Sequence, residues 1–410
     1  MSSGDLFQVG GFGAAILMMF ALSSVFDRVN AGLIGEIVAG VVASQLGLFA
    51  PHDAALQFAS VCCLLFVVTD AGISSDAGLL RKHFWRSLLI AVTGVAAPIA
   101  IAFGFFHAIL GFSLTASAVG GVALASTSAG TSIRILTDSR LLATPVGTHV
   151  LSAAMLDDVM SLFALSVVLA VGPALATNDS SRLALAATMP IVTAIALLIG
   201  IILIHRFVLP TMMQRSKSVA ASLVLLFFTG FTVAIVVLVW FVGGSPFVAA
   251  FACGVSFGDS IRSTWNDKCG PHVRLMQRIF FLGTGAALPI RALFSSHDLL
   301  FGFIYSLLSL ASKAVCGLAY WPDFWTVSLA MIARGDLGFL MLSSAASVNI
   351  IDSSLAAICV WALISNTLVG PLLLSLFLRR KRTQKAVTAE QFDAGFHSAN
   401  DDDDDDDELI

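Results

Sequence analysis

Long apolar stretches separated by short polar ones make up most of this 410-residue chain. An apolar stretch of about 18 residues or more is long enough to cross the hydrocarbon core of a bilayer, about 30 Å thick, as an α-helix. The pattern predicts thirteen such helices, with twelve as the alternative because the ninth is short and the second is marginal. They run approximately over 8–26, 33–49, 54–73, 85–110, 113–135, 148–171, 184–208, 218–241, 245–259, 279–295, 299–320, 325–347 and 354–378.

Composition agrees with that pattern. Hydrophobic residues make up 58% of the chain, charged residues only 12%, and the mean hydropathy is +0.93. An average soluble domain holds about 25% charged residues. The sequence therefore predicts an all-α, multi-pass membrane protein.

The basic residues predict an orientation in the membrane. A cluster of Lys and Arg follows the last apolar stretch, and loops on the cytoplasmic side carry an excess of these residues. With thirteen spans, the C-terminus is then cytoplasmic and the N-terminus outside. This topology leaves most of the 22 basic residues on the inner side of the membrane. Residues 379–410, which end in the acidic run 401–408, are expected to form a disordered cytoplasmic tail. Whether the membrane is the plasma membrane or that of an organelle is left open.

Two adjacent acids, Asp157 and Asp158, lie in the middle of the apolar stretch 148–171. A charge at this depth costs a few kcal/mol or more, so such residues mark ion or proton pathways. Lys313 and Arg334 are the only deeply placed bases, and we expect Lys313 to pair with one of the two acids. Neighbours on a helix point about 100° apart, so the other acid can face a water-filled cavity. The alternative is that the pair only locks helices together.

Two of the predicted spans contain helix-breaking sequence. Residues 126–132 read Ser-Thr-Ser-Ala-Gly-Thr-Ser, and residues 333–338 read Ala-Arg-Gly-Asp-Leu-Gly. Unwound backbone at membrane depth is tolerated only inside protein or beside a water-filled cavity. Two broken helices at corresponding positions of inverted repeats indicate a transport site at the midplane. Close helix packing at small residues is the alternative interpretation.

Several of these motifs together resemble a known family, the monovalent cation:proton antiporters, in the branch with an aspartate-aspartate motif. The resemblance covers roughly residues 10–378 and is carried by Leu156-Asp157-Asp158-Val159, Ser312-Lys313-Ala314-Val315-Cys316-Gly317, Arg334-Gly335-Asp336-Leu337-Gly338, Gly35-Glu36 in the second span, and Thr127-Ser128 in the fifth. Asp336 departs from the family, which usually has glutamate there.

The resemblance implies a role for each motif. Asp158 is expected to bind the cation and the proton alternately, and Asp157 to pair with Lys313 when no sodium is bound. The cavity at the crossing helices is expected to be lined by Thr127, Ser128 and Thr131. Supporting roles are expected for Arg334, Asp336 and Glu36.

The resemblance also implies an architecture and a transport mode. We expect inverted repeats with two crossed, broken helices, in which a core domain (85–171 and 299–378) moves against a scaffold domain (8–73 and 218–295) that forms a homodimer. The expected activity is electrogenic exchange of sodium or lithium for protons by alternating access. No cofactor, catalytic residue or nucleic-acid partner is expected, only cations, protons and the bilayer.

Three other functions stay open at this stage. Potassium in place of sodium is the nearest, because hydroxyl, carbonyl and carboxylate oxygens serve all these hard cations. A cation channel also uses dispersed acids and broken helices. An intramembrane aspartyl protease needs two carboxyls that share one proton, and adjacent residues on one helix suit that arrangement poorly.

Overall fold

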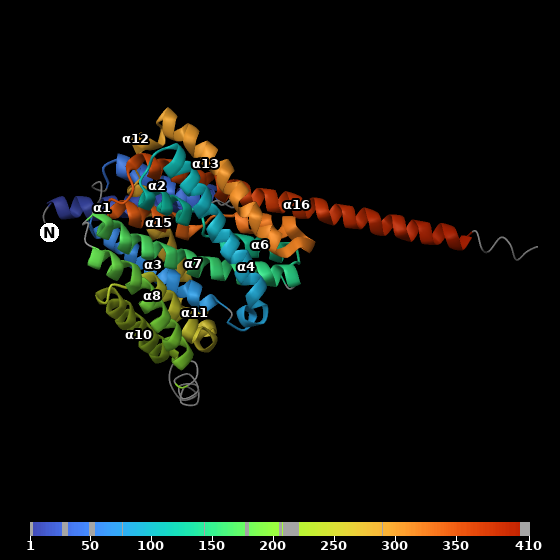
Figure 1. Ribbon diagram of the computed structural model, residues 1–410, viewed down its shortest axis with the longest axis horizontal. Coiled ribbons are helices and arrows are strands. Elements are labelled where there is room, and N and C mark those ends of the chain that lie inside the picture. The colour runs from blue at the N-terminus through green and yellow to red at the C-terminus, as the bar shows by residue number, and fades with distance from the viewer. Residues whose placement is uncertain are drawn as a thin grey trace, which may run out of the picture.

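The computed structural model describes residues 3–26, 32–48, 54–75, 77–142, 144–176, 180–204, 207, 221–288 and 290–401. Within those ranges the chain forms fifteen α-helices and no β-strand, which confirms the predicted all-α class. Figure 1 shows a compact bundle from which the C-terminal part of α16 projects as a single long helix.

The N-terminal half supplies the first eight helices and a π-helical segment, η2, that continues α4. They are α1 (Ser3–Phe26), α2 (Gly32–Gln45), α3 (Ala54–Ser74), α4 (Ala77–Ala102), η2 (Phe103–Ile109), α5 (Leu114–Ala123), α6 (Ala129–Asp138), α7 (Pro145–Ala176) and α8 (Ser180–Leu203).

The C-terminal half supplies the remaining helices and a 3-10 segment, η4, that joins α13 to α14. They are α10 (Ala221–Phe241), α11 (Pro246–Ala286), α12 (Ile290–Leu293), α13 (Ser296–Ala314), η4 (Val315–Asp323), α14 (Phe324–Ile332), α15 (Asp336–Ser347) and α16 (Ser353–Asp401).

Six of the described helices are long and apolar enough to cross a membrane, or seven if the bent pair α14 and α15 counts as one span. The count of thirteen separate spans is not confirmed. The span predicted at 245–259 and the beginning of the span predicted at 279–295 fall in one continuous helix, α11, which ends at Ala286. The polar residues between them do not interrupt it, because helix formation tolerates polar side chains, and Pro271 is accommodated inside the helix. The placement of the two termini on opposite sides of the membrane stays a prediction.

α11 packs closely along α3 and α2 through small residues. Gly72 of α3 lies against Gly254 of α11, and a Cβ atom at either position would collide with the backbone of the other helix. Gly40 of α2 lies equally close to the backbone of α11 at Leu282. Small residues let helix backbones approach in membranes, where packing rather than the hydrophobic effect holds helices together. These three helices therefore form one tightly packed unit.

The two helix breaks predicted from sequence are present. The first separates α5 from α6 at residues 124–128, and the second separates α14 from α15 at residues 333–335. The second pair bends by 43°. The breaks meet, since the backbone N–H of Ser128 donates to the carbonyl of Ala333 at 2.7 Å. This contact lets each unwound stretch satisfy part of the other's backbone polarity.

α16 continues as a helix to Asp401, past residue 379 where the sequence predicts the tail to begin. The acidic residues 402–408 lie outside the described residues.

Candidate ion-binding site at the two broken helices

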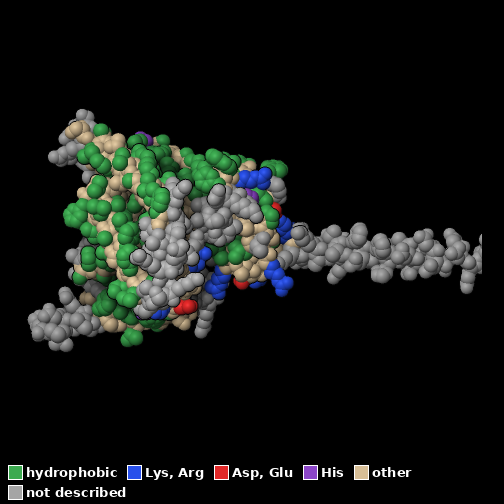
Figure 2. All heavy atoms as spheres, turned by 90° about the horizontal axis from the view of Figure 1, so that it is seen from below, with side chains coloured by type: hydrophobic (Ala, Val, Ile, Leu, Met, Phe, Trp, Pro, Cys, Tyr) green, Lys and Arg blue, Asp and Glu red, His purple; other side chains and the backbone are tan. Residues whose placement is uncertain are grey.

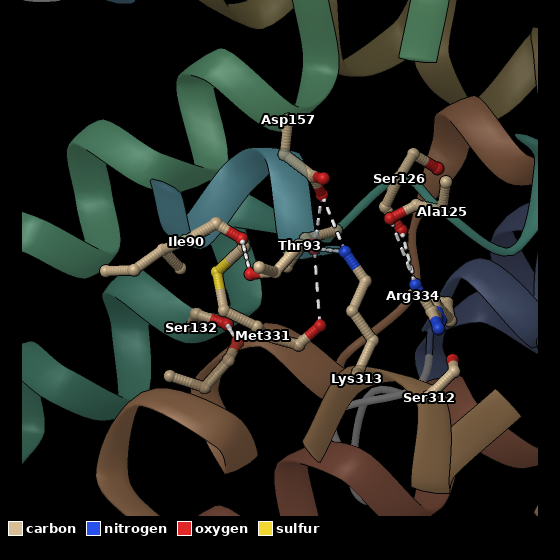
Figure 3. Close-up of polar contacts among 12 residues, drawn as sticks. Ile90, Thr93, Ala125, Ser126, Ser132, Asp157, Ser312, Lys313, Met331 and Arg334 are labelled. Carbon is tan, nitrogen blue, oxygen red and sulfur yellow. Dashed lines mark hydrogen bonds and ion pairs between the residues drawn. The ribbon is translucent and has the colours of Figure 1, made fainter. Parts of the chain in front are cut away.

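A fully buried ion pair joins α7 to α13 beside the helix breaks. Lys313 Nζ lies 3.0 Å from Asp157 Oδ2, and both side chains are 0% exposed. Figure 3 shows the lysine reaching toward the aspartate from the opposite side of the site. The ion pair expected between Lys313 and one of the two acids is therefore present, and the acid is Asp157.

Thr127 connects that ion pair to both broken helices. Its hydroxyl donates to Asp157 Oδ2 at 2.6 Å and accepts from Lys313 Nζ at 3.0 Å. The same hydroxyl lies 3.2 Å from the carbonyl oxygen of Met331, at the end of α14. Hydrogen bonds to charged groups are about twice as strong as neutral ones, so the unwound stretch after α5 is tied to the charge pair.

Asp158 lies next to this pair on α7 and is only partly buried. The angle of about 100° between neighbouring helix positions explains why one acid is enclosed and the other is not. The two carboxylates therefore differ in environment, one held by a lysine and a hydroxyl and one nearer to solvent.

Arg334 lies in the second break and binds the end of the first broken helix. Its Nη1 donates to the carbonyls of Ala125 at 3.1 Å and Ser126 at 3.2 Å, as Figure 3 shows. Its Nη2 donates to Ser309 Oγ at 3.1 Å. Carbonyls of unwound backbone at membrane depth need a donor within the protein. Arg334 thus satisfies two carbonyls of the stretch that follows α5, although only 1% of its own surface is exposed.

The other predicted residues of the crossing lie at the starts of α6 and α15. Ser128 and Thr131 hydrogen-bond to each other through their hydroxyls at 2.9 Å. Asp336 is the first residue of α15, and its side chain lies outside the described part of the structure.

Glu36 lies in another cluster and links α1, α2 and α11. Ser23 donates to Glu36 Oε1 at 3.0 Å, and Arg278 Nε lies 3.3 Å from the same oxygen. The structure therefore does not bring Glu36 together with the aspartate pair.

Sequence reasoning missed three residues that support the site. Gly94 of α4 faces the ion pair, and a Cβ atom there would lie 3.1 Å from Lys313 Nζ. Ser309 and Asn366 extend the arginine network, since Asn366 Nδ2 donates to Ser309 Oγ at 2.8 Å. Glycine and serine are enriched where transmembrane helices pack, and asparagine forms hydrogen bonds between them, so nothing in the sequence separates these three from residues that only hold helices together.

Several polar atoms around the junction are buried and make no hydrogen bond within the described part of the chain. They are Asp157 Oδ1, Ser126 Oγ, Arg334 Nε and Asn366 Oδ1. Buried polar atoms nearly always have a partner, so unpaired ones gathered at one place indicate where water or an ion is accommodated.

An apolar helical bundle with two broken helices that meet at a buried charge pair is the architecture of a secondary transporter. Comparison with known proteins names the family. The profile of the transmembrane sodium/hydrogen exchanger family matches residues 14–380, and the chain belongs to this family.

Individual relatives are distant but extend over most of the chain. A Na⁺/H⁺ antiporter of Enterococcus hirae is 23% identical over 364 residues, which cover 85% of this chain and 92% of that protein. The iron transporter MagA of Paramagnetospirillum magneticum is 26% identical over 377 residues, which cover 88% of this chain and 83% of that protein.

A solved structure has the same fold. The sodium proton antiporter MjNhaP1 from Methanocaldococcus jannaschii superposes with a TM-score of 0.69 at 14% sequence identity, covering 91% of this chain and 97% of that one. At this identity the likeness concerns the fold alone.

Proposed function

We propose that this protein exchanges a monovalent cation, sodium or lithium first among them, for protons by alternating access. The observation that carries the proposal is the buried pair of Asp157 and Lys313 next to the partly exposed Asp158, at the place where two broken helices meet. The antiporters among its relatives support the same activity.

Asp158 is proposed to bind the proton and the cation in turn. A hard monovalent cation needs the ionised carboxylate as an oxygen ligand, while a proton neutralises that carboxylate. The two ligands therefore exclude each other at one site. Exchange becomes obligatory if the site changes sides only when it is loaded with one of them.

Lys313 and Asp157 are proposed to make the exchange electrogenic. When sodium enters between the two carboxylates, Asp157 exchanges its lysine partner for the cation, and Lys313 releases a proton. Asp158 releases the other proton. Two protons then move one way for each sodium ion that moves the other way, so one net charge crosses the membrane per cycle.

We also propose that the helices act as two domains, a core (85–171 and 299–378) and a dimer-forming scaffold (8–73 and 218–295). Support comes from packing: α11 lies along α2 and α3, whereas the two helix breaks and the ion pair join α5, α7, α13 and α14. Charge supports a cytoplasmic C-terminus, because a basic cluster ends the last apolar stretch of α16. If the N-terminus lies outside, the chain must cross the membrane an odd number of times. Labelling a cysteine introduced near the N-terminus with a membrane-impermeant reagent measures on which side it lies.

Two rival activities, iron transport and intramembrane proteolysis, fit the site less well. Among the residues that the structure describes, no group of three or more His, Cys, Asp or Glu side chains could hold a metal ion, as a resident iron site would need. A proton-sharing aspartyl dyad is disfavoured because Lys313 already occupies Asp157.

Transport assays in proteoliposomes test the proposal. An imposed sodium gradient should drive proton movement reported by a pH-sensitive dye, and reversing the gradient should reverse that movement. Asp158→Asn should abolish it. Glu36→Gln, which neutralises a buried acid outside the site, should preserve the proton movement.

Two outcomes contradict the proposal. Substantial sodium-driven proton movement by Asp158→Asn excludes the role given to Asp158, and cation flux without any proton movement indicates a channel. Electrogenicity is tested separately: at clamped voltage, Asp157→Asn should lose the voltage dependence of exchange, and unchanged dependence excludes the role of Asp157. Potassium and Fe²⁺ in place of sodium test the two alternative substrates.

A further inference from the structure

The buried face of α13 is polar, whereas its outward face is apolar. Every buried residue of this helix, from Asp298 to Lys313, is glycine or carries a polar side chain. The outward face carries Leu300, Phe303 and Leu307, each more than half exposed, and apolar side chains of this kind cover much of the surface in Figure 2. Polar side chains directed into the interior of a membrane bundle mark functional contacts, so the partners of this face identify what it does.

Three residues of the buried face, spaced four apart, reach the first broken helix. Lys313 donates to the hydroxyl of Thr127, and Ser309 accepts from the arginine that binds the carbonyls after α5. At the far end of the row, the hydroxyl of Tyr305 donates to the carbonyl of Gly120 at 3.1 Å. Residues four apart lie on one side of a helix, and eight residues span about 12 Å. α13 therefore contacts the first broken helix from its last regular turn to the cation site.

Two phenylalanines of η2 pack on the ring of Tyr305, which is 1% exposed. Phe105 stacks on this ring with centroids 5.4 Å and planes 6° apart, and Phe106 meets it edge-on with centroids 4.4 Å apart. The two are adjacent in sequence yet both buried, since the wide turn of a π-helix brings neighbours toward one side. Phe106 also covers Gly120, where a Cβ atom would lie 2.6 Å from its ring. This packing holds the Tyr305 hydroxyl against the end of α5.

The carbonyl that Tyr305 binds lies where the regular helix gives way to unwound backbone. The N–H of Leu124 reaches the same Gly120 carbonyl at 3.3 Å, and that of Ala125 reaches the carbonyl of Val122 at 3.0 Å. A carbonyl oxygen has two lone pairs, so the tyrosine binds it without displacing the helix's own bond. Tyr305 thus ties α13 to the last turn before the stretch that carries Thr127.

We propose that Tyr305 is a positioning residue for the cation site, an inference that rests on the proposed exchange function. It does not touch the cation. Its hydrogen bond fixes the last turn of α5, and this turn sets where the hydroxyl of Thr127 lies between Asp157 and Lys313. Without that bond the aromatic rings still pack, but the unwound stretch occupies more positions and the cation binds more weakly.

The sodium dependence of exchange by the full-length protein in proteoliposomes tests this inference. Tyr305→Phe removes the hydroxyl and keeps the ring, so we expect the KM for sodium to rise about 3- to 10-fold, the size of one lost hydrogen bond, with the maximal rate within about 2-fold. Ser306→Ala is the matched control on the same helix. It removes a buried hydroxyl that bonds to its own helix at Gly302, so both parameters should stay unchanged.

A double variant shows whether Tyr305 acts through Thr127. Thr127→Val alone should raise the KM for sodium, and adding Tyr305→Phe should then have little further effect, because the hydroxyl that it positions is already absent. Hydrogen exchange followed by mass spectrometry in detergent gives a second readout without transport. The amides of Leu124 and Ser128 should exchange faster in Tyr305→Phe, while those of α11 should be unchanged.

An unchanged KM for sodium in Tyr305→Phe overturns the inference, and so does a maximal rate that falls while KM stays the same. Fold-changes that multiply in the double variant also overturn it, because they show that Tyr305 acts independently of Thr127. If the unmodified protein moves no protons in response to sodium, the proposed function fails by itself. Hydrogen exchange then decides separately whether Tyr305 positions the first break, and unchanged exchange at residues 124–128 refutes it.

Discussion

Replacing Asp157 by asparagine tests whether the buried ion pair stabilises the junction of the broken helices. The substitution keeps the side-chain volume and one acceptor oxygen but removes the charge that faces Lys313. Lys313 is 0% exposed, and its other hydrogen-bond partner among the described residues is the Thr127 hydroxyl. Removing one member of a buried ion pair costs about 3–5 kcal/mol because the remaining charge is left without compensation. We expect a loss near the lower figure, since asparagine can still accept a hydrogen bond from Thr127.

That loss can be measured as a shift in melting temperature. The unfolding entropy is about 2.1 cal/mol/K per residue, or about 0.9 kcal/mol/K for this length, so a loss of about 3 kcal/mol lowers the melting temperature by roughly 3–4 °C. Unfolding is followed by tryptophan fluorescence in detergent at one fixed scan rate, because irreversible unfolding makes the midpoint depend on that rate.

A double variant and a control make the measurement specific. Asp157→Asn combined with Lys313→Met should recover most of the loss, because replacing a buried ion pair by neutral side chains is often nearly neutral. Glu36→Gln should cost only about 1 kcal/mol, since its partner Arg278 keeps 31% of its side chain exposed and remains solvated. A double variant as unstable as Asp157→Asn alone would refute the reasoning, and so would a single variant that melts with the unmodified protein.

Three further substitutions probe the junction itself. Gly335→Ala places a Cβ atom 2.9 Å from the Cβ of Ser128, so we expect the two breaks to separate and initial exchange rates in proteoliposomes to fall at least 10-fold, while an unchanged rate contradicts the close contact. Arg334→Lys cannot reach two carbonyls and Ser309 at once, and we expect a loss of about 2 kcal/mol in detergent melting; full stability would show that the guanidinium fork is not needed. Thr127→Val removes a hydroxyl that hydrogen-bonds to both members of the ion pair, so we expect slower exchange at a normal expression level. An unchanged exchange rate would contradict this expectation.

Much of the fold could be predicted from the sequence because helix formation in a membrane is a local matter. Each apolar stretch must satisfy its own backbone hydrogen bonds in lipid, so length and hydropathy suffice to place it. The same reasoning predicted breaks at 126–132 and 333–338, which overlap the observed breaks at 124–128 and 333–335, because hydroxyl-rich and glycine-containing stretches differ clearly from their apolar surroundings. It fails at α11, where the pattern predicts a loop between two apolar stretches, although polar side chains do not interrupt a helix.

The candidate site could be predicted only in part. The residues themselves indicated that Lys313 pairs with one of two acids, and the family resemblance pointed to Asp157, but the choice between the acids depends on how α7 is rotated against α13. Likewise, spacing could not show that Arg334 binds the carbonyls of Ala125 and Ser126, which lie in an unwound stretch about 200 positions away in the sequence.

The sequence by itself determined that the protein is a bundle of membrane helices, where the two helices break, and that paired acids and a lysine share the interior. These properties follow from the cost of placing polar groups in lipid, which each segment meets alone. Only the tertiary structure decided that Asp157 is enclosed while Asp158 is partly exposed, and that Gly94, Ser309 and Asn366 support the site. Those outcomes depend on the rotation and packing of helices against one another, and packing is set by all the neighbours of a side chain together rather than by its own stretch of sequence.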